Sequence, residues 1–145
     1  MNNLLKIFAT LFFSVSLYAE TVSVMTFNVE NLFDNKNDAY KTDETYLEFS
    51  KKQTPLHIKN CEKISTKRWR DDCLYIDWTD EVIEHKLNSI ASVILSYGSN
   101  GPDIIGLQEV ENKRILKKLF KKLEEAGYKD LSLIHISEPT RPLGI

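Results

Sequence analysis

The chain has 145 residues, of which 42% are hydrophobic and 28% are charged, with 5 Gly, 4 Pro and 2 Cys. This is the composition of an ordinary globular protein, and it excludes the collagen-like, disordered and disulfide-dense classes. Lys and Arg total 19 against 21 Asp and Glu, a formal net charge of −2, so overall charge alone does not predict binding to nucleic acid or to a membrane. The length allows one domain.

Residues 1–19 are typical of a secretory signal peptide. One early cation, Lys6, precedes an apolar run from Ile7 to Leu17, and Ala19 ends the segment. The run is too short to span a bilayer, and polar, periodic sequence follows it. We therefore expect an exported protein, secreted or periplasmic, with no membrane span after cleavage. A buried N-terminal helix or an uncleaved anchor is the alternative.

Residues 131–145 resemble the translation of a sequencing-library adapter. The string LSLIHISEPTR, which begins at Leu131, carries this likeness. We expect residues 20–130 to represent the natural protein and residues 131–145 to be an artefact. The alternative is a genuine tail, which Pro139 and Pro142 would make irregular.

Two strands are predicted from apolar runs. Residues 21–29 (TVSVMTFNV) are rich in β-branched and apolar residues with little alternation, a pattern that favours a strand covered on both faces. A second run, residues 103–107 (DIIGL), follows the turn signal Asn-Gly-Pro at residues 100–102.

Two helices are predicted from apolar periodicity, one between the strands and one after them. Thr79 is placed to cap the first helix, and Gly98 to end it. Its apolar stripe is Ile83, Leu87, Ile90, Ala91 and Ile94. Gly127 ends the second helix, whose stripe is Leu116, Leu119, Phe120 and Leu123. The order strand, long loop, helix, strand, helix predicts an α/β fold with a right-handed β-α-β unit of parallel strands.

Polar residues follow both predicted strands. Parallel strands joined by a crossover helix bring their carboxyl ends to one edge of the sheet, where α/β sheets bind ligands. Asn28 and Glu109 are the candidates at this edge, because an amide and a carboxylate oxygen are hard ligands suited to Mg²⁺ or Mn²⁺. Turn formation or helix capping by these residues is the structural alternative.

Two segments at the same strand ends carry a resemblance to a known family. Residues 25–34 (MTFNVENLFD) and residues 101–110 (GPDIIGLQEV) resemble the first two motifs of the endonuclease/exonuclease/phosphatase superfamily. The resemblance implies a four-layered α/β sandwich, of which residues 20–130 would form the β-α-β-α N-terminal portion. It also implies hydrolysis of phosphoester bonds with a divalent metal, Mg²⁺ or Mn²⁺.

The resemblance also implies roles for individual residues. Glu109 matches the family's metal-ligand glutamate, and Asn28 matches the asparagine that contacts the metal and the phosphate of the substrate. Gln108 would be a supporting neighbour that contacts the substrate. The role of Glu30 stays open, because it stands where many relatives carry another polar residue, and it is a candidate to cap the following turn.

The later motifs of that superfamily, a catalytic histidine, a Gly-Asp-x-Asn segment and an Asp-His pair, are not found in this sequence. We therefore expect the chain itself to be inactive, because its general base is absent. For the complete gene product we expect an exported nuclease that acts on DNA or RNA and needs no stable protein partner. The alternatives are a phosphatase, a sphingomyelinase-like phospholipid phosphodiesterase, and a non-catalytic binding module of the same fold.

Residues 34–77 are predicted to be a loop insertion, and a connection this long within a compact domain usually indicates function, local structure or an insertion. The segment contains Cys61 and Cys73, and an even pair of cysteines in an exported chain favours one disulfide. Zinc binding is not expected, since there is no second Cys-x-x-Cys pair and His57 does not complete a ligand set.

Basic residues surround Trp69 in this segment, a pattern that favours phosphate contacts and base stacking in some proteins. They are Lys63, Lys67, Arg68 and Arg70. Nearby acidic residues dilute this charge, so a solvated turn with the Trp packed inward is slightly favoured. The basic residues of the second helix are expected to form a solvent face, and His85 is expected to be exposed.

Overall fold

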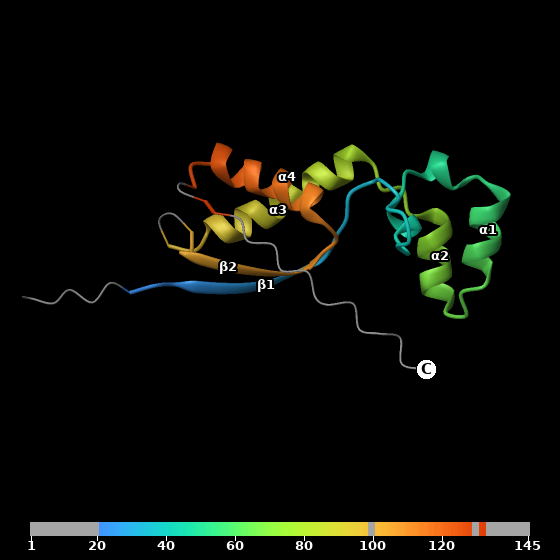
Figure 1. The fold of residues 1–145 in the computed structure, drawn as a ribbon, viewed down its shortest axis with the longest axis horizontal. Helices are drawn as coiled ribbons and strands as arrows, with labels where there is room; N and C mark the ends of the chain where they lie inside the picture. The colour runs from blue at the N-terminus through green and yellow to red at the C-terminus, as the bar shows by residue number, and fades with distance from the viewer. Residues whose placement is uncertain (1–20, 99–100, 129–130, 133–145) are drawn as a thin grey trace, which may run out of the picture.

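The structure is a computed structural model that describes residues 21–98, 101–128 and 131–132. The predicted signal peptide and residues 133–145 of the adapter-like tail lie outside the described residues. The described chain is a mixture of helices and strands built around a two-stranded sheet (Figure 1). The expected partial α/β fold is therefore confirmed.

Strands β1 (Val24–Leu32) and β2 (Ile104–Val110) are parallel and pair directly. The pairing is regular from Val24 with Ile104 to Asn28 with Gln108, and it resumes where Leu32 pairs with Val110. Both strands extend beyond the predicted ends at residues 29 and 107. The residues of β1 between Asn28 and Leu32 form a bulge, after which the pairing with β2 continues.

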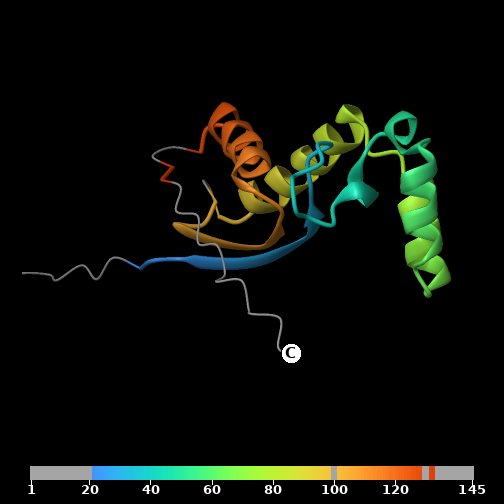
Figure 2. The same cartoon turned by 45° about the vertical axis from the view of Figure 1, so that its right-hand side comes forward.

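Helices α3 (Asp80–Leu95) and α4 (Lys113–Glu125) cover the same face of the sheet (Figures 1 and 2). The side chain of Thr79 caps α3 by accepting a hydrogen bond from the backbone N–H of Val82 at 3.3 Å, as predicted. All five residues of the predicted α3 stripe are buried. In α4 Leu119 and Leu123 of the predicted stripe are buried, but the third buried residue is Ile115, and Leu116 and Phe120 are only half-buried.

The opposite face of the sheet is open in the part of the chain that the structure describes. Val24 is 63% exposed and Ile104 is 54% exposed, whereas Met25 and Phe27 pack against the core. Burial therefore alternates along β1, and the prediction of a strand covered on both faces is wrong for the described residues. The physical reason is that both helices lie on one side of the sheet.

The predicted long loop contains local helical structure, which is one of the interpretations that its length left open. It folds as two 3-10 turns, η1 (Glu44–Tyr46) and η2 (Phe49–Lys52), followed by α1 (Pro55–Glu62) and α2 (Lys67–Tyr75). A disulfide joins Cys61 of α1 to Cys73 of α2, with a Cα–Cα distance of 5.7 Å. The ammonium of buried Lys52 donates hydrogen bonds to the backbone carbonyls of Thr45 and Ile76. The segment is thus held mainly by a covalent bond and polar contacts.

None of the described helices has both the length and the apolar character needed to cross a membrane.

Candidate active site at the strand ends

The two residues selected from the strand-end pattern meet in the structure. The side-chain Nδ2 of Asn28 donates a hydrogen bond to Oε1 of Glu109 at 2.7 Å. Asn28 stands opposite Gln108 in the sheet register, so Glu109 is the next residue along β2. Both Asn28 and Glu109 are exposed residues.

The backbone around this pair adopts an unusual conformation. Glu30, Asn31 and Glu109 all have positive φ angles, of 50°, 61° and 61°, a region that non-glycine residues seldom occupy. Each such residue costs on the order of 1 kcal/mol or more, and such residues concentrate at functional sites. The result here is that two backbone N–H groups point at the site. The N–H of Glu30 donates to Oδ1 of Asn28 at 2.8 Å, and that of Asn31 donates to Oε2 of Glu109 at 3.1 Å.

These contacts determine which way the Asn28 amide points. Its oxygen accepts from the Glu30 N–H, and its nitrogen donates to the Glu109 carboxylate. Exchanging the two atoms would place a donor against a donor and an acceptor against an acceptor. Asn28 therefore directs its N–H₂ group, and not its oxygen, toward Glu109.

The arrangement fits a hard divalent cation at Glu109. Each carboxylate oxygen of Glu109 accepts one hydrogen bond, which leaves lone pairs on an exposed group. Mg²⁺ is commonly bound by one or two carboxylates, with water and substrate phosphate completing its shell. The donor chemistry and exposure of Glu109 match this pattern.

The other two residues considered at this edge make different contacts. Gln108 is exposed beside Asn28, and its side-chain amide donates a long, 3.5 Å hydrogen bond to the carbonyl of Gly106. The carbonyl of Glu30 accepts a hydrogen bond from the ammonium of Lys86 at 2.8 Å. Lys86 thus links α3 to the bulge of β1.

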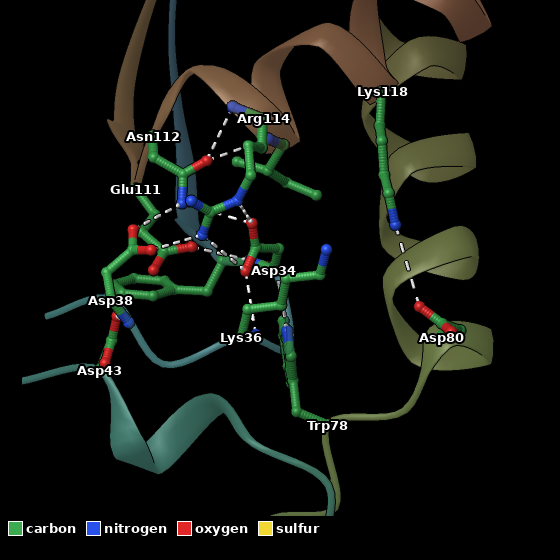
Figure 3. Close-up of polar contacts among 12 residues, drawn as sticks. Asp34, Lys36, Asp38, Asp43, Trp78, Asp80, Glu111, Asn112, Arg114 and Lys118 are labelled. Atoms are coloured by element: carbon green, nitrogen blue, oxygen red, sulfur yellow. Dashed lines mark hydrogen bonds and ion pairs between the residues drawn. The ribbon is translucent and has the colours of Figure 1, made fainter.

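A second polar cluster, which the sequence reasoning missed, lies just beyond the same strand ends (Figure 3). The guanidinium of Arg114 pairs with Asp34 at 2.8 Å and with Asp38 at 2.7 Å. The backbone N–H of Asp34 donates to Oε2 of Glu111 at 2.8 Å, and the N–H of Asp38 donates to Oδ2 of Asp43 at 3.0 Å. The cluster joins the segment after β1 to the segment after β2.

The cluster sets opposite pKa directions on two of its carboxyl groups. Burial alone would raise the pKa of Asp34, but hydrogen bonds from Arg114, the Lys36 backbone and Asn112 outweigh it and hold that pKa below its ordinary value. At Glu111, burial is the largest cause and the neighbouring acidic groups add to it, which raises its pKa to about 7.

A sequence signal for this cluster did exist. Asp34, Asp38 and Asp43 recur within ten residues after the first strand, and Glu111 follows Glu109 by two positions. The strand-end argument that selected Glu109 applies equally to Glu111. What the sequence did not indicate is that the segment after β1 turns back to meet it.

Several further predictions concern side chains away from the strand ends. His85 is exposed, as predicted, but Trp69 is 65% exposed, so the prediction that it packs inward is wrong. The reason is that α2 turns its cysteine side inward, toward α1. His57 Nε2 lies 3.0 Å from the carbonyl of Cys73.

The basic residues of α4 form a less free surface than expected. Arg114 pairs with two aspartates, and Lys122 pairs with Glu84 of α3 at 2.6 Å. The Lys122 pair forms because α4 packs beside α3, whereas the Arg114 pairs join the first turn of α4 to the segment after β1.

A hollow of about 600 Å³ lies over the α1–α2 segment and is lined in part by Leu56, His57 and Ile64. Neither Asn28 nor Glu109 lines it. The candidate site is an open sheet edge and not an enclosed pocket.

Comparison with known proteins supplies one match. A model of the endonuclease/exonuclease/phosphatase family matches residues 73–145. The matched range includes Glu109 and the acidic Glu111, whereas Asn28 lies before it. No curated protein and no solved structure matches the chain.

Proposed function

The chain belongs to the endonuclease/exonuclease/phosphatase family, and we propose that Asn28 and Glu109 form the metal-binding part of a site that hydrolyses phosphoester bonds. The observation that carries this proposal is the 2.7 Å contact between these two side chains at neighbouring strand ends. Their exposure gives solvent and substrate access to both.

The two residues have different roles in the proposed site. Glu109 is the metal ligand, and a Mg²⁺ or Mn²⁺ ion bound there supplies positive charge against the scissile phosphate and its leaving oxygen. Asn28 and the backbone N–H of Asn31 each hold one oxygen of Glu109, so the carboxylate is oriented before an ion binds. Such outer contacts tune the position and basicity of a metal ligand.

The proposed substrate is nucleic acid, for which the position of α2 is the support. The α1–α2 pair lies beyond the carboxyl ends of β1 and β2 in both views (Figures 1 and 2). There the ring of Trp69 is exposed, and the exposed Lys67 and Arg68 directly precede it in the sequence while Arg70 follows it. An exposed aromatic ring flanked by cations stacks on a base and contacts the backbone phosphates of a single strand.

The proposed location is outside the cytoplasm, in the periplasm or the external medium. The bond between Cys61 and Cys73 supports this, because structural disulfides persist in oxidising compartments and are rare in the cytosol.

Metal binding is the first test. In the wild-type chain, Mn²⁺ should broaden the NMR signal of the Asn28 side-chain amide, because Nδ2 contacts the proposed ligand. Glu109→Gln should weaken Mn²⁺ binding, and with it the broadening, at least about tenfold. Mutation of a residue that only contacts a metal ligand can already lower metal affinity by this factor. Glu30→Gln is the matched control, since Glu30 is an exposed carboxylate in the same bulge. Equal broadening in the wild type and in Glu109→Gln would refute the assignment.

Substrate class is tested on the complete gene product. We expect turnover of DNA or RNA that chelator abolishes, and a loss of kcat in Glu109→Gln. Trp69→Ala should raise KM for nucleic acid and leave the turnover of a small phosphodiester unchanged. Turnover of sphingomyelin or phosphate monoesters alone would move the assignment to a phospholipase or a phosphatase. Binding without turnover of any substrate would indicate a non-catalytic module.

A further inference from the structure

Three carboxylates that have no role in the proposed reaction converge beside the active-site edge. Asp38 and Asp43 lie in the segment between β1 and η1, and Glu111 follows β2 directly. One oxygen from each of the three residues lies within 4.8 Å of those of the other two. Figure 3 shows the three side chains approaching one another from the two segments.

The hydrogen bonds around these carboxylates leave two oxygens unmatched. Oδ2 of Asp43 accepts from the Asp38 backbone, and Oε2 of Glu111 accepts from the Asp34 backbone. Oδ1 of Asp43 and Oε1 of Glu111 are buried and have no hydrogen-bond partner among the described residues. Asp43 is only 3% exposed, so its side chain is shielded from bulk solvent. A buried carboxylate oxygen without a partner carries a desolvation penalty that a bound cation removes.

No cationic side chain among the described residues bonds to these two oxygens. Arg114 bonds to Asp34 and to Asp38, and Asn112 donates to the same two aspartates at 3.3 Å. Asp43 and Glu111 thus form the part of the cluster that lacks a counter-charge.

We propose that Asp38, Asp43 and Glu111 bind a Ca²⁺ ion that ties the segment after β1 to the end of β2. All three donors are carboxylates, which excludes soft metals on ligand preference. Three carboxylates from two connecting segments suit Ca²⁺, which takes six to eight oxygens in variable geometry. Mg²⁺ usually keeps several waters and takes one or two carboxylates. The site differs from the proposed catalytic one, because the Glu109 oxygens bond to Asn28 and Asn31.

The test measures Ca²⁺ binding to the 145-residue chain after treatment with chelator, by calorimetry and by thermal melting. We expect one Ca²⁺ per chain and a Tm that rises with Ca²⁺ concentration, because an ion that binds the folded state alone stabilises it. Asp43→Asn keeps the shape of the side chain and should weaken Ca²⁺ binding at least about tenfold. Asp38→Asn, at a less buried position, should do the same and serves if Asp43→Asn does not fold.

Two control variants separate this site from other carboxylates and from the catalytic proposal. Asp71→Asn removes an aspartate of α2 that pairs with Lys67 and should leave Ca²⁺ affinity unchanged. Glu109→Gln should also leave it unchanged, so failure of the proposed function and failure of this site give different results.

The proposal is overturned if the wild-type chain neither binds Ca²⁺ nor gains Tm, which would mean that Asp43 and Glu111 share a proton instead. It is also overturned if Asp43→Asn and Asp38→Asn bind Ca²⁺ as tightly as the wild type, or if Glu109→Gln alone abolishes binding.

Discussion

The β-α-β-α unit and the segment from η1 to α2 reach stability by different means. In the first, α3 and α4 bury regular apolar stripes against one face of the sheet. In the second, the buried hydrophobic residues are Leu47 and the two bonded cysteines, and a lysine is buried among them. A short segment with so little apolar burial needs cross-links and polar contacts to remain folded. The same chain thus combines a region held by the hydrophobic effect with a region held by a disulfide and hydrogen bonds.

The largest expected effect tests the apolar region. Leu87→Ala removes a fully buried side chain from α3 and should lower the free energy of unfolding by about 3 kcal/mol, since large-to-small core substitutions lose burial and leave a cavity. Val93→Ala on the exposed side of the same helix is the control and should cost less than about 1 kcal/mol. Equal losses measured by urea unfolding would contradict a core on this face.

The next effect tests the cross-linked region. Replacing Cys61 and Cys73 with Ser should cost about 2 to 3 kcal/mol in the chain-entropy description of a short closed loop. The loss should be local, because the bond joins α1 to α2 only. Hydrogen exchange should therefore accelerate in α1 and α2 while β1 and α3 keep their protection. A uniform loss of protection would mean that the two regions unfold together.

Lys52 gives the second region a distinctive dependence on pH. Burial is the main cause that lowers its pKa from 10.5 to about 8, so between these values the unfolded chain binds more protons than the folded one. Stability should therefore rise with pH across this window, by up to about 3 kcal/mol, and the cost of burying the charge is fully present below pH 8.

The measurement for Lys52 compares urea unfolding of the wild type and Lys52→Met from pH 8 to 10.5. Subtracting the two profiles removes the titration of the other lysines and tyrosines. A difference between the profiles that does not change with pH would show that Lys52 has an ordinary pKa in the folded chain.

The smallest effect lies at the junction of the two regions. Thr79 caps α3 through the Val82 N–H, so Thr79→Ala should cost about 1 kcal/mol, the usual loss for an N-cap. Thr79→Ser keeps the hydroxyl and should lose only a few tenths of a kcal/mol. Thermal melts of the two variants that coincide would show that the cap contributes no stability.

Prediction from sequence succeeded where local pattern and topology carry the information. The stripe from Ile83 to Ile94 repeats at the helical period, and its burial followed from that period alone. The contact between Asn28 and Glu109 was reached through the rule that parallel strands align their carboxyl ends. Prediction from sequence failed in residues 34–77, where α1 and α2 are short and Lys52 occupies a buried position. Neither a short helix nor a buried lysine produces a periodic pattern of apolar residues.

What the sequence by itself determined is the order of the strands and the two longer helices, together with the polar residues at the strand ends, because each depends on patterns within a few turns or residues. The tertiary structure alone decided that the segment after β1 turns back to place Asp38 and Asp43 beside Glu111, and that Trp69 faces solvent. These features depend on contacts between residues tens of positions apart, whose geometry is set by how the helices and strands pack and not by any local preference.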